Sequence, residues 1–123
     1  MPVAGTDALL ALGVPAQLAE LMGATPATQA GSGTTQAGTP TILKSKSVEL
    51  TASGGNTAFI MNSGIGVNEP IFVFNSSGTT ALVFPPLNGT LNNSTTVPLS
   101  VGATQGAWIW QYKKGFWASV LTH

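Results

Sequence analysis

The sequence predicts a mainly β protein, an antiparallel β-sandwich or barrel (jelly-roll-like) of about seven strands that follows a short two-helix N-terminal arm. From residue 41 onward, short apolar stretches recur with turn residues between them, as in all-β domains. Residues 1–23 instead carry leucines at helical spacing. Residues 24–40 contain no large apolar side chain. The expected division is therefore a helical arm over 1–23, a flexible Thr/Gly/Ala/Pro linker over 24–40, and a β-domain over 41–123.

The strands of the β-domain are placed by alternating apolar residues between turn signals such as Asn88-Gly89. Within 107–112, alternation places Trp108, Trp110 and Tyr112 on one side of a strand and Ile109 on the other. The stretch 71–74 is apolar on both faces, which is typical of a strand at the centre of a core or at a subunit contact. The predicted strands are 42–50, 57–61, 71–75, 80–84, 95–101, 107–112 and 117–121.

The N-terminal arm is predicted as two short helices. Thr6 can cap the first helix, which Gly13 ends, and Pro15 can begin a second helix that ends at Gly23. Both helices are shorter than the roughly 12–15 residues that make an isolated helix even marginally stable, so they must dock on something. Their leucines can pack on the chain's own β-domain or on a neighbouring subunit, and the length of the linker favours the neighbour.

The composition is unusually poor in charge. The chain has four basic and four acidic residues among 123, no Cys and one His, so its net charge is zero. An ordinary domain is about one quarter charged, and a neutral surface favours association. These features are typical of a subunit that is covered by neighbours in an assembly.

The same composition argues against catalysis, and we expect a protein that is not an enzyme. The acids are scattered, His123 is the terminal residue, and there is no nucleophile elbow or phosphate-binding glycine loop. We therefore expect no catalytic residues, no cofactor and no metal site. Four lysines balanced by four acids make no basic stripe, so no nucleic-acid partner is expected. No apolar run is long enough for a membrane span, and the N-terminus shows no signal peptide.

The aromatic residues near the C-terminal end form the most suggestive cluster. Such a row can fill a core, form a subunit interface or stack on sugars, and the core or interface interpretation is favoured. Together with the apolar side chains of the arm, these residues are the predicted contact set. The set comprises Leu9, Leu10, Leu12, Leu18, Leu21, Met22, Trp108, Trp110, Tyr112 and Trp117.

Several stretches resemble small structural proteins of tailed bacteriophages. They are 12–19 (LGVPAQLA), 55–60 (GNTAFI), 70–77 (PIFVFNSS), 80–86 (TALVFPP) and 110–119 (WQYKKGFWAS). The resemblance implies a virion component, most plausibly a head decoration (cement) protein. Such a protein forms a homotrimer on the outer capsid surface and stabilises contacts between major capsid proteins. The alternative is the base of a head fibre or tail fibre, or a glycan-binding receptor module.

Overall fold

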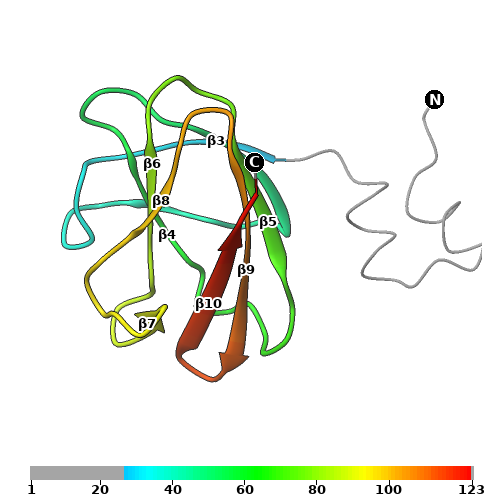
Figure 1. Ribbon diagram of the computed structural model, residues 1–123. Coiled ribbons are helices and arrows are strands. Elements are labelled where there is room, and N and C mark those ends of the chain that lie inside the picture. The colour runs from blue at the N-terminus through cyan, green and yellow to red at the C-terminus, as the bar shows by residue number, and fades with distance from the viewer. Residues whose placement is uncertain (1–26, 123) are drawn as a thin grey trace, which may run out of the picture.

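The computed structural model describes residues 27–122, which form ten strands and no helix. The strands are β1 (Ala27–Ala30), β2 (Thr41–Ile42), β3 (Ser47–Thr51), β4 (Ala58–Ile60), β5 (Ile71–Asn75), β6 (Ala81–Phe84), β7 (Thr90–Leu91), β8 (Leu99–Val101), β9 (Gly106–Lys113) and β10 (Phe116–Leu121). A six-stranded sheet has the order β1-β3-β5-β9-β10-β7, and a four-stranded sheet has the order β2-β4-β6-β8. Figure 1 shows the two sheets as the two sides of the body.

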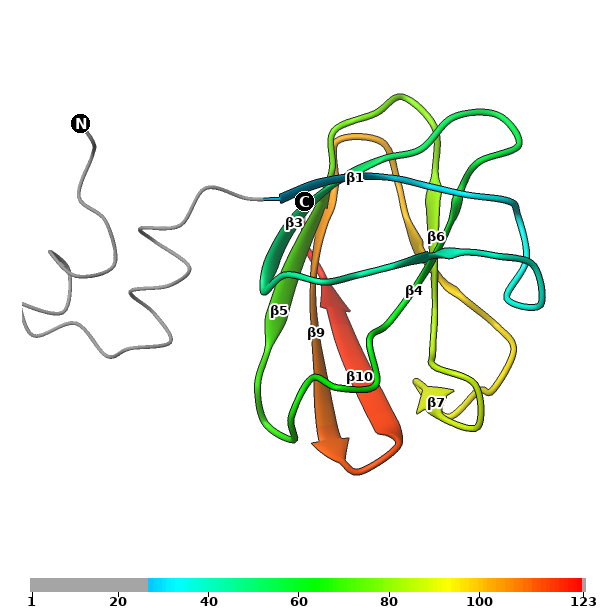
Figure 2. The same cartoon turned by 180° about the vertical axis from the view of Figure 1, so that it is seen from behind.

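The first six strands wind as a solenoid. Odd-numbered strands enter the six-stranded sheet and even-numbered strands enter the four-stranded sheet, so each turn contributes one strand to each side. As a result β1, β3 and β5 stack in parallel, and β2, β4 and β6 do the same. Figure 2 shows β1, β3 and β5 along one side and β4 and β6 along the other. The fold is a β-solenoid of about four turns.

The last turn reverses direction and closes the stack. Strand β8 pairs antiparallel with β6, β9 pairs antiparallel with β5, and β10 returns along β9 as a hairpin. Gly115 takes a φ of 84° in the hairpin turn, a conformation that favours glycine. A register shift between Phe116 and Trp117 marks a bulge at the start of β10.

The predicted antiparallel sandwich or barrel of about seven strands is wrong. Within residues 27–122, five of the eight strand pairs are parallel, and the strands number ten. Parallel neighbours need a long crossover connection. Here the crossover is itself a strand of the opposite sheet: β4 lies between β3 and β5 in the chain.

The predicted arm and the predicted linker compare differently with the structure. The two-helix arm over 1–23 lies outside the described residues. Residues 27–30 of the predicted linker form β1, which pairs with β3 from Ala27↔Val48 to Ala30↔Thr51. A strand at a sheet edge can be held by backbone hydrogen bonds, and so needs no large apolar side chain of its own.

The core lies between the two sheets. Inward side chains follow the register from strand to strand, as in the row Val48–Val73–Ala107. Phe59 and Val83 face them from the four-stranded sheet and are fully buried. All buried members of this cluster come from residues 43–117, so the described body holds a continuous core of its own.

Two buried polar side chains, Asn75 and Gln111, are satisfied by hydrogen bonds. Asn75 donates from Nδ2 to the carbonyl oxygens of Thr79 (2.7 Å), Val101 (3.0 Å) and Gly102 (3.2 Å). Its Oδ1 accepts from the Ser77 backbone N–H at 3.0 Å. This residue therefore fastens the end of β5 to the end of β8, where the two sheets approach each other.

Candidate docking surface

The outer side of the six-stranded sheet carries a continuous group of aromatic side chains. In β5 the inward residues are Ile71 and Val73, so Phe72 and Phe74 point outward. Strand β9 continues the pattern, with Ile109 buried between outward-facing Trp108 and Trp110. The register joins the two strands, because Phe72 is the partner of Trp108.

The hairpin strand β10 extends this group. Val120 lies opposite Trp108, and Ala118 lies opposite Trp110. We call the resulting surface the aromatic face, and it consists of Phe72, Phe74, Trp108, Trp110, Tyr112, Phe116 and Val120. It spans three neighbouring strands, β5, β9 and β10.

Neighbouring rings of the aromatic face contact each other, yet several of its side chains remain exposed to solvent. The Phe72 and Trp108 rings lie 5.1 Å apart between centroids and are tilted by 54°. Tyr112 and Phe116 lie 6.3 Å apart, with Lys113 Nζ 5.1 Å from the Phe116 centroid. Even so, Phe74 is 37%, Tyr112 45% and Val120 54% exposed. A contiguous apolar surface of this kind usually marks an interaction site.

Beyond β5 the outer side of the sheet becomes polar. The register continues from Phe74 to Glu49 of β3 and on to Thr28 of β1. The Glu49 carboxylate accepts hydrogen bonds from Thr28 Oγ1 at 3.2 Å and from Ser76 Oγ at 2.5 Å. A hollow of about 250 Å³ lies at this border, lined by residues of β3 together with Phe72 and Phe74. The aromatic face therefore has an apolar centre and a polar rim, as docking surfaces do.

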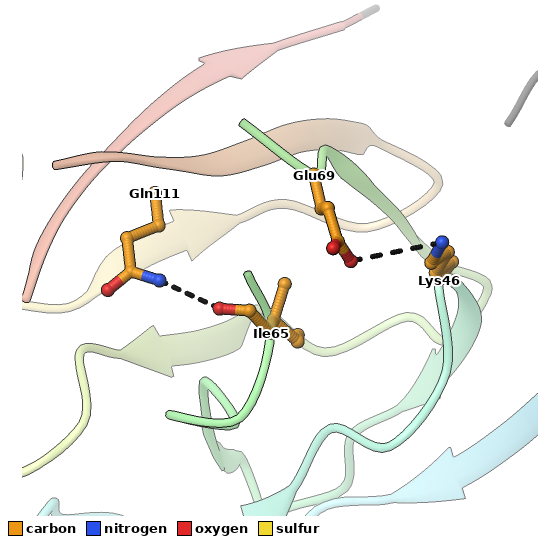
Figure 3. A network of polar contacts seen from close by, with 4 residues as sticks. All are labelled: Lys46, Ile65, Glu69 and Gln111. Carbon is orange, nitrogen blue, oxygen red and sulfur yellow. Dashed lines mark hydrogen bonds and ion pairs between the residues drawn. The ribbon is translucent and has the colours of Figure 1, made fainter. Parts of the chain in front are cut away.

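Gln111 anchors the end of the aromatic face that carries Tyr112 and Phe116. Its Nε2 donates to the Ile65 carbonyl at 2.7 Å, and its Oε1 accepts from the Gly115 N–H at 2.6 Å. Figure 3 shows the first of these contacts near the Lys46–Glu69 pair, whose charged atoms lie 3.9 Å apart. The Gln111 side chain thus ties both the preceding loop and the hairpin turn to β9. The ion pair is partly exposed and contributes little to stability.

The structure separates the predicted contact residues into three groups. Trp108, Trp110 and Tyr112 lie together on the aromatic face, so the predicted alternation of 107–112 is confirmed. Trp117 does not lie with them: it is 1% exposed and belongs to the core. The arm residues lie outside the described part of the chain; they are Leu9, Leu10, Leu12, Leu18, Leu21 and Met22.

Four residues of the aromatic face were not among the predicted contact residues. They are Phe72, Phe74, Phe116 and Val120. The sequence does carry a signal for Phe72 and Phe74, because the stretch 71–74 is apolar on both faces. A strand with one solvent-exposed face would instead alternate apolar and polar residues. Phe116 belongs to the C-terminal aromatic cluster that the sequence singles out, although it was not in the predicted contact set. Val120 carries no such signal, since its side of β10 depends on the bulge at Phe116 and Trp117.

In residues 27–122 the possible metal ligands do not cluster. No group of three or more His, Cys, Asp or Glu residues lies together among them. In the same part of the chain there is no helix long and apolar enough to cross a membrane. A smaller hollow of about 130 Å³ beside the Pro86–Gly89 turn is lined by turn residues, Gln111 and the buried Trp117.

The comparisons add no relative: no family model, no curated protein and no solved structure matches the chain. The fold and its surface therefore define the class of protein by themselves. It is an all-β solenoid whose body presents an aromatic sheet face bordered by polar residues.

Proposed function

We propose that this chain is a structural component of a tailed-bacteriophage virion, a decoration (cement) protein that binds the outer surface of the head. The observation that carries the proposal is the aromatic face, an apolar surface over three strands that is suited to docking on protein. The low charge of the chain and the phage-like stretches of its sequence support the same function.

The mechanism is stabilisation by preferential binding. A protein that binds the assembled shell, and not the separate capsid subunits, stabilises the shell in proportion to its affinity and concentration. Burying an aromatic side chain of this size contributes about 1.5–3 kcal/mol. The aromatic face offers several such side chains, and symmetry repeats the contact over the capsid. The partners are the major capsid protein and, through the resemblance, further copies of this chain in a homotrimer.

One observation favours a second function, a glycan-binding module at the base of a fibre. Trp108, Trp110 and Tyr112 form an outward row on one strand, and flat aromatic rings can stack on sugars. The support is narrower than it is for protein docking. Trp117 is in the core, and the Glu49 carboxylate at the border already accepts two hydrogen bonds.

The test is binding of the purified full chain to phage heads that lack it, measured by co-sedimentation. Trp110→Ser removes an aromatic ring from the centre of the face, and we expect affinity to fall by about 10- to 100-fold, equivalent to about 1.4–2.8 kcal/mol. Val97→Ser is the matched control, because Val97 is 63% exposed and lies just before β8, a strand of the other sheet. Equal binding by the two variants would contradict docking on the head through the aromatic face. Binding to a glycan array with no binding to heads would favour the fibre module.

A further inference from the structure

We propose that residues 9–22 of the chain itself cover the aromatic face in the free protein. The apolar side chains of this segment are Leu9, Leu10, Leu12, Val14, Leu18, Leu21 and Met22, and they lie outside the described body. The described core cluster is built from residues 43–117. The aromatic face is an apolar surface that this core leaves exposed.

The chain enters the body close to the aromatic face. Strand β1 begins at Ala27, which is in register with Val48, Val73 and Ala107. This is one residue from the row in which Ser47, Phe72 and Trp108 are partners. The first described residue therefore lies nearly level with the centre of the aromatic face, on the same sheet.

The connection is long enough for the segment to reach its own body. Strand β1 is two strands from β5 and three from β9, which corresponds to about 10 and 14 Å across the sheet. Residues 23–26 can span about 13 Å when extended. A tether this short gives the segment an effective concentration in the millimolar range at its own face, well above that of a second copy in dilute solution.

The charges also agree with this arrangement. Residues 1–23 contain two acids, Asp7 and Glu20, and no Lys or Arg. The exposed charges next to the aromatic rings at the β9–β10 turn are Lys113 and Lys114, and Lys113 lies over the Phe116 ring. A leucine-rich segment with two acids thus suits the apolar centre and the border at the β9–β10 turn. The opposite border carries the acid Glu49, whose carboxylate is hydrogen-bonded to Thr28 and Ser76.

If the proposed function is correct, the segment and the phage head compete for one surface. The free protein then keeps its docking surface covered until it meets the capsid, and the apparent affinity for heads is lowered by the covered fraction. This consequence rests on the proposed function, whereas the intramolecular contact does not.

Paramagnetic relaxation tests the contact in the full chain without any phage particle. The sequence has no cysteine and three tryptophans, so Gln17→Cys accepts one nitroxide, and ¹⁵N-labelled tryptophan gives three indole signals. We expect the signals of Trp108 and Trp110 to lose most of their intensity and that of the buried Trp117 to lose less. Single Trp→Phe variants assign the signals. The control is a nitroxide at Ser100→Cys, on the exposed side of β8 in the other sheet. With this nitroxide, we expect no selective loss of the Trp108 and Trp110 signals relative to that of Trp117.

Two samples separate the same copy from a neighbour. In the first, nitroxide and ¹⁵N label are on one molecule; in the second, nitroxide-bearing unlabelled protein is mixed with ¹⁵N-labelled protein without nitroxide. Broadening in the first sample alone supports the proposal. Broadening in the mixed sample places the segment on a neighbouring copy, and no broadening in either sample leaves the face uncovered; both outcomes overturn it. These measurements do not involve phage heads. The intramolecular contact and the proposed head binding can therefore each fail independently of the other.

Discussion

At the scale of single residues, the side chains that organise this protein are few and their partners are specific. Asn75 is fully buried; its Nδ2 group shares its two hydrogens among three carbonyl oxygens, and its Oδ1 accepts from the Ser77 N–H and from Ser77 Oγ. In the sequence, Asn75 is only the last residue of the predicted strand 71–75. Nothing in a local pattern shows that its amide reaches carbonyl groups near residue 101, because that contact depends on how the two sheets meet.

Asn75→Leu is expected to lower the free energy of unfolding by about 3 kcal/mol, because buried carbonyl groups and the Ser77 N–H lose their partner. Asn62→Ala is the control: the Asn62 side chain accepts one exposed bond, from the Gly64 N–H. We expect its cost to stay below about 1 kcal/mol. Urea unfolding of both variants measures the difference, and similar losses would contradict the role assigned to Asn75.

The aromatic residues show how far alternation can be read from the sequence. It places Trp108, Trp110 and Tyr112 on one side of β9, as the structure confirms. Trp117 was grouped with them and lies in the core, as the partner of Gln111 in the register. The bulge after Phe116 changes which side of β10 faces inward, and a bulge has no signature in the spacing of apolar residues.

At the scale of elements, strand positions are readable while strand pairing is not. The predicted strand 71–75 coincides with β5, and 80–84 contains β6. The predicted strand 42–50 is instead split into β2 and β3, which belong to different sheets. Alternating residues show which side of a strand is buried, yet they are the same whether the neighbour is parallel or antiparallel. That ambiguity produced the wrong fold class.

The first turn of the solenoid depends on the side chain of Gln29. Its Nε2 donates to the Ile42 carbonyl at 2.8 Å, and its Oε1 accepts from the Lys44 N–H at 3.2 Å. Gln29→Ala removes these two links from β1 to Ile42 and Lys44, and leaves the bond from Thr41 Oγ1 to the Ala30 carbonyl. We expect faster hydrogen exchange in residues 27–31 and 41–44, with exchange in β9 and β10 unchanged. Faster exchange throughout both sheets would show that the first turn is not a separate element.

At Gly31 the backbone lies close to the backbone of residues 56 and 57. A Cβ at Gly31 would press against the backbone carbonyl of Asn56, whereas one at Gly54 meets nothing within 4 Å. Gly31→Ala should therefore destabilise the fold by about 2 kcal/mol, since backbone must move to admit the methyl group. Gly54→Ala should be nearly neutral, and thermal unfolding of the pair measures the contrast. Equal melting temperatures would contradict the close packing of these turns.

At the scale of the whole molecule, the body is a scaffold that holds one surface. The solenoid turns stack β1, β3 and β5, and the final hairpin adds β9 and β10, so the six-stranded sheet is broad enough for the aromatic face. From composition alone, the sequence indicated a neutral protein made to be covered by neighbours. It located the part of the surface on β9 but not the whole, because residues of β5 and β10 become adjacent only through β9.

The most direct test of the account is where the protein is found after phage particles are disrupted. Heads and tails are separated, and the chain is measured in each fraction by quantitative mass spectrometry. The account predicts that it remains with the heads, in a fixed ratio to the major capsid protein. Recovery with tails or fibres, or absence from the particle, would contradict it.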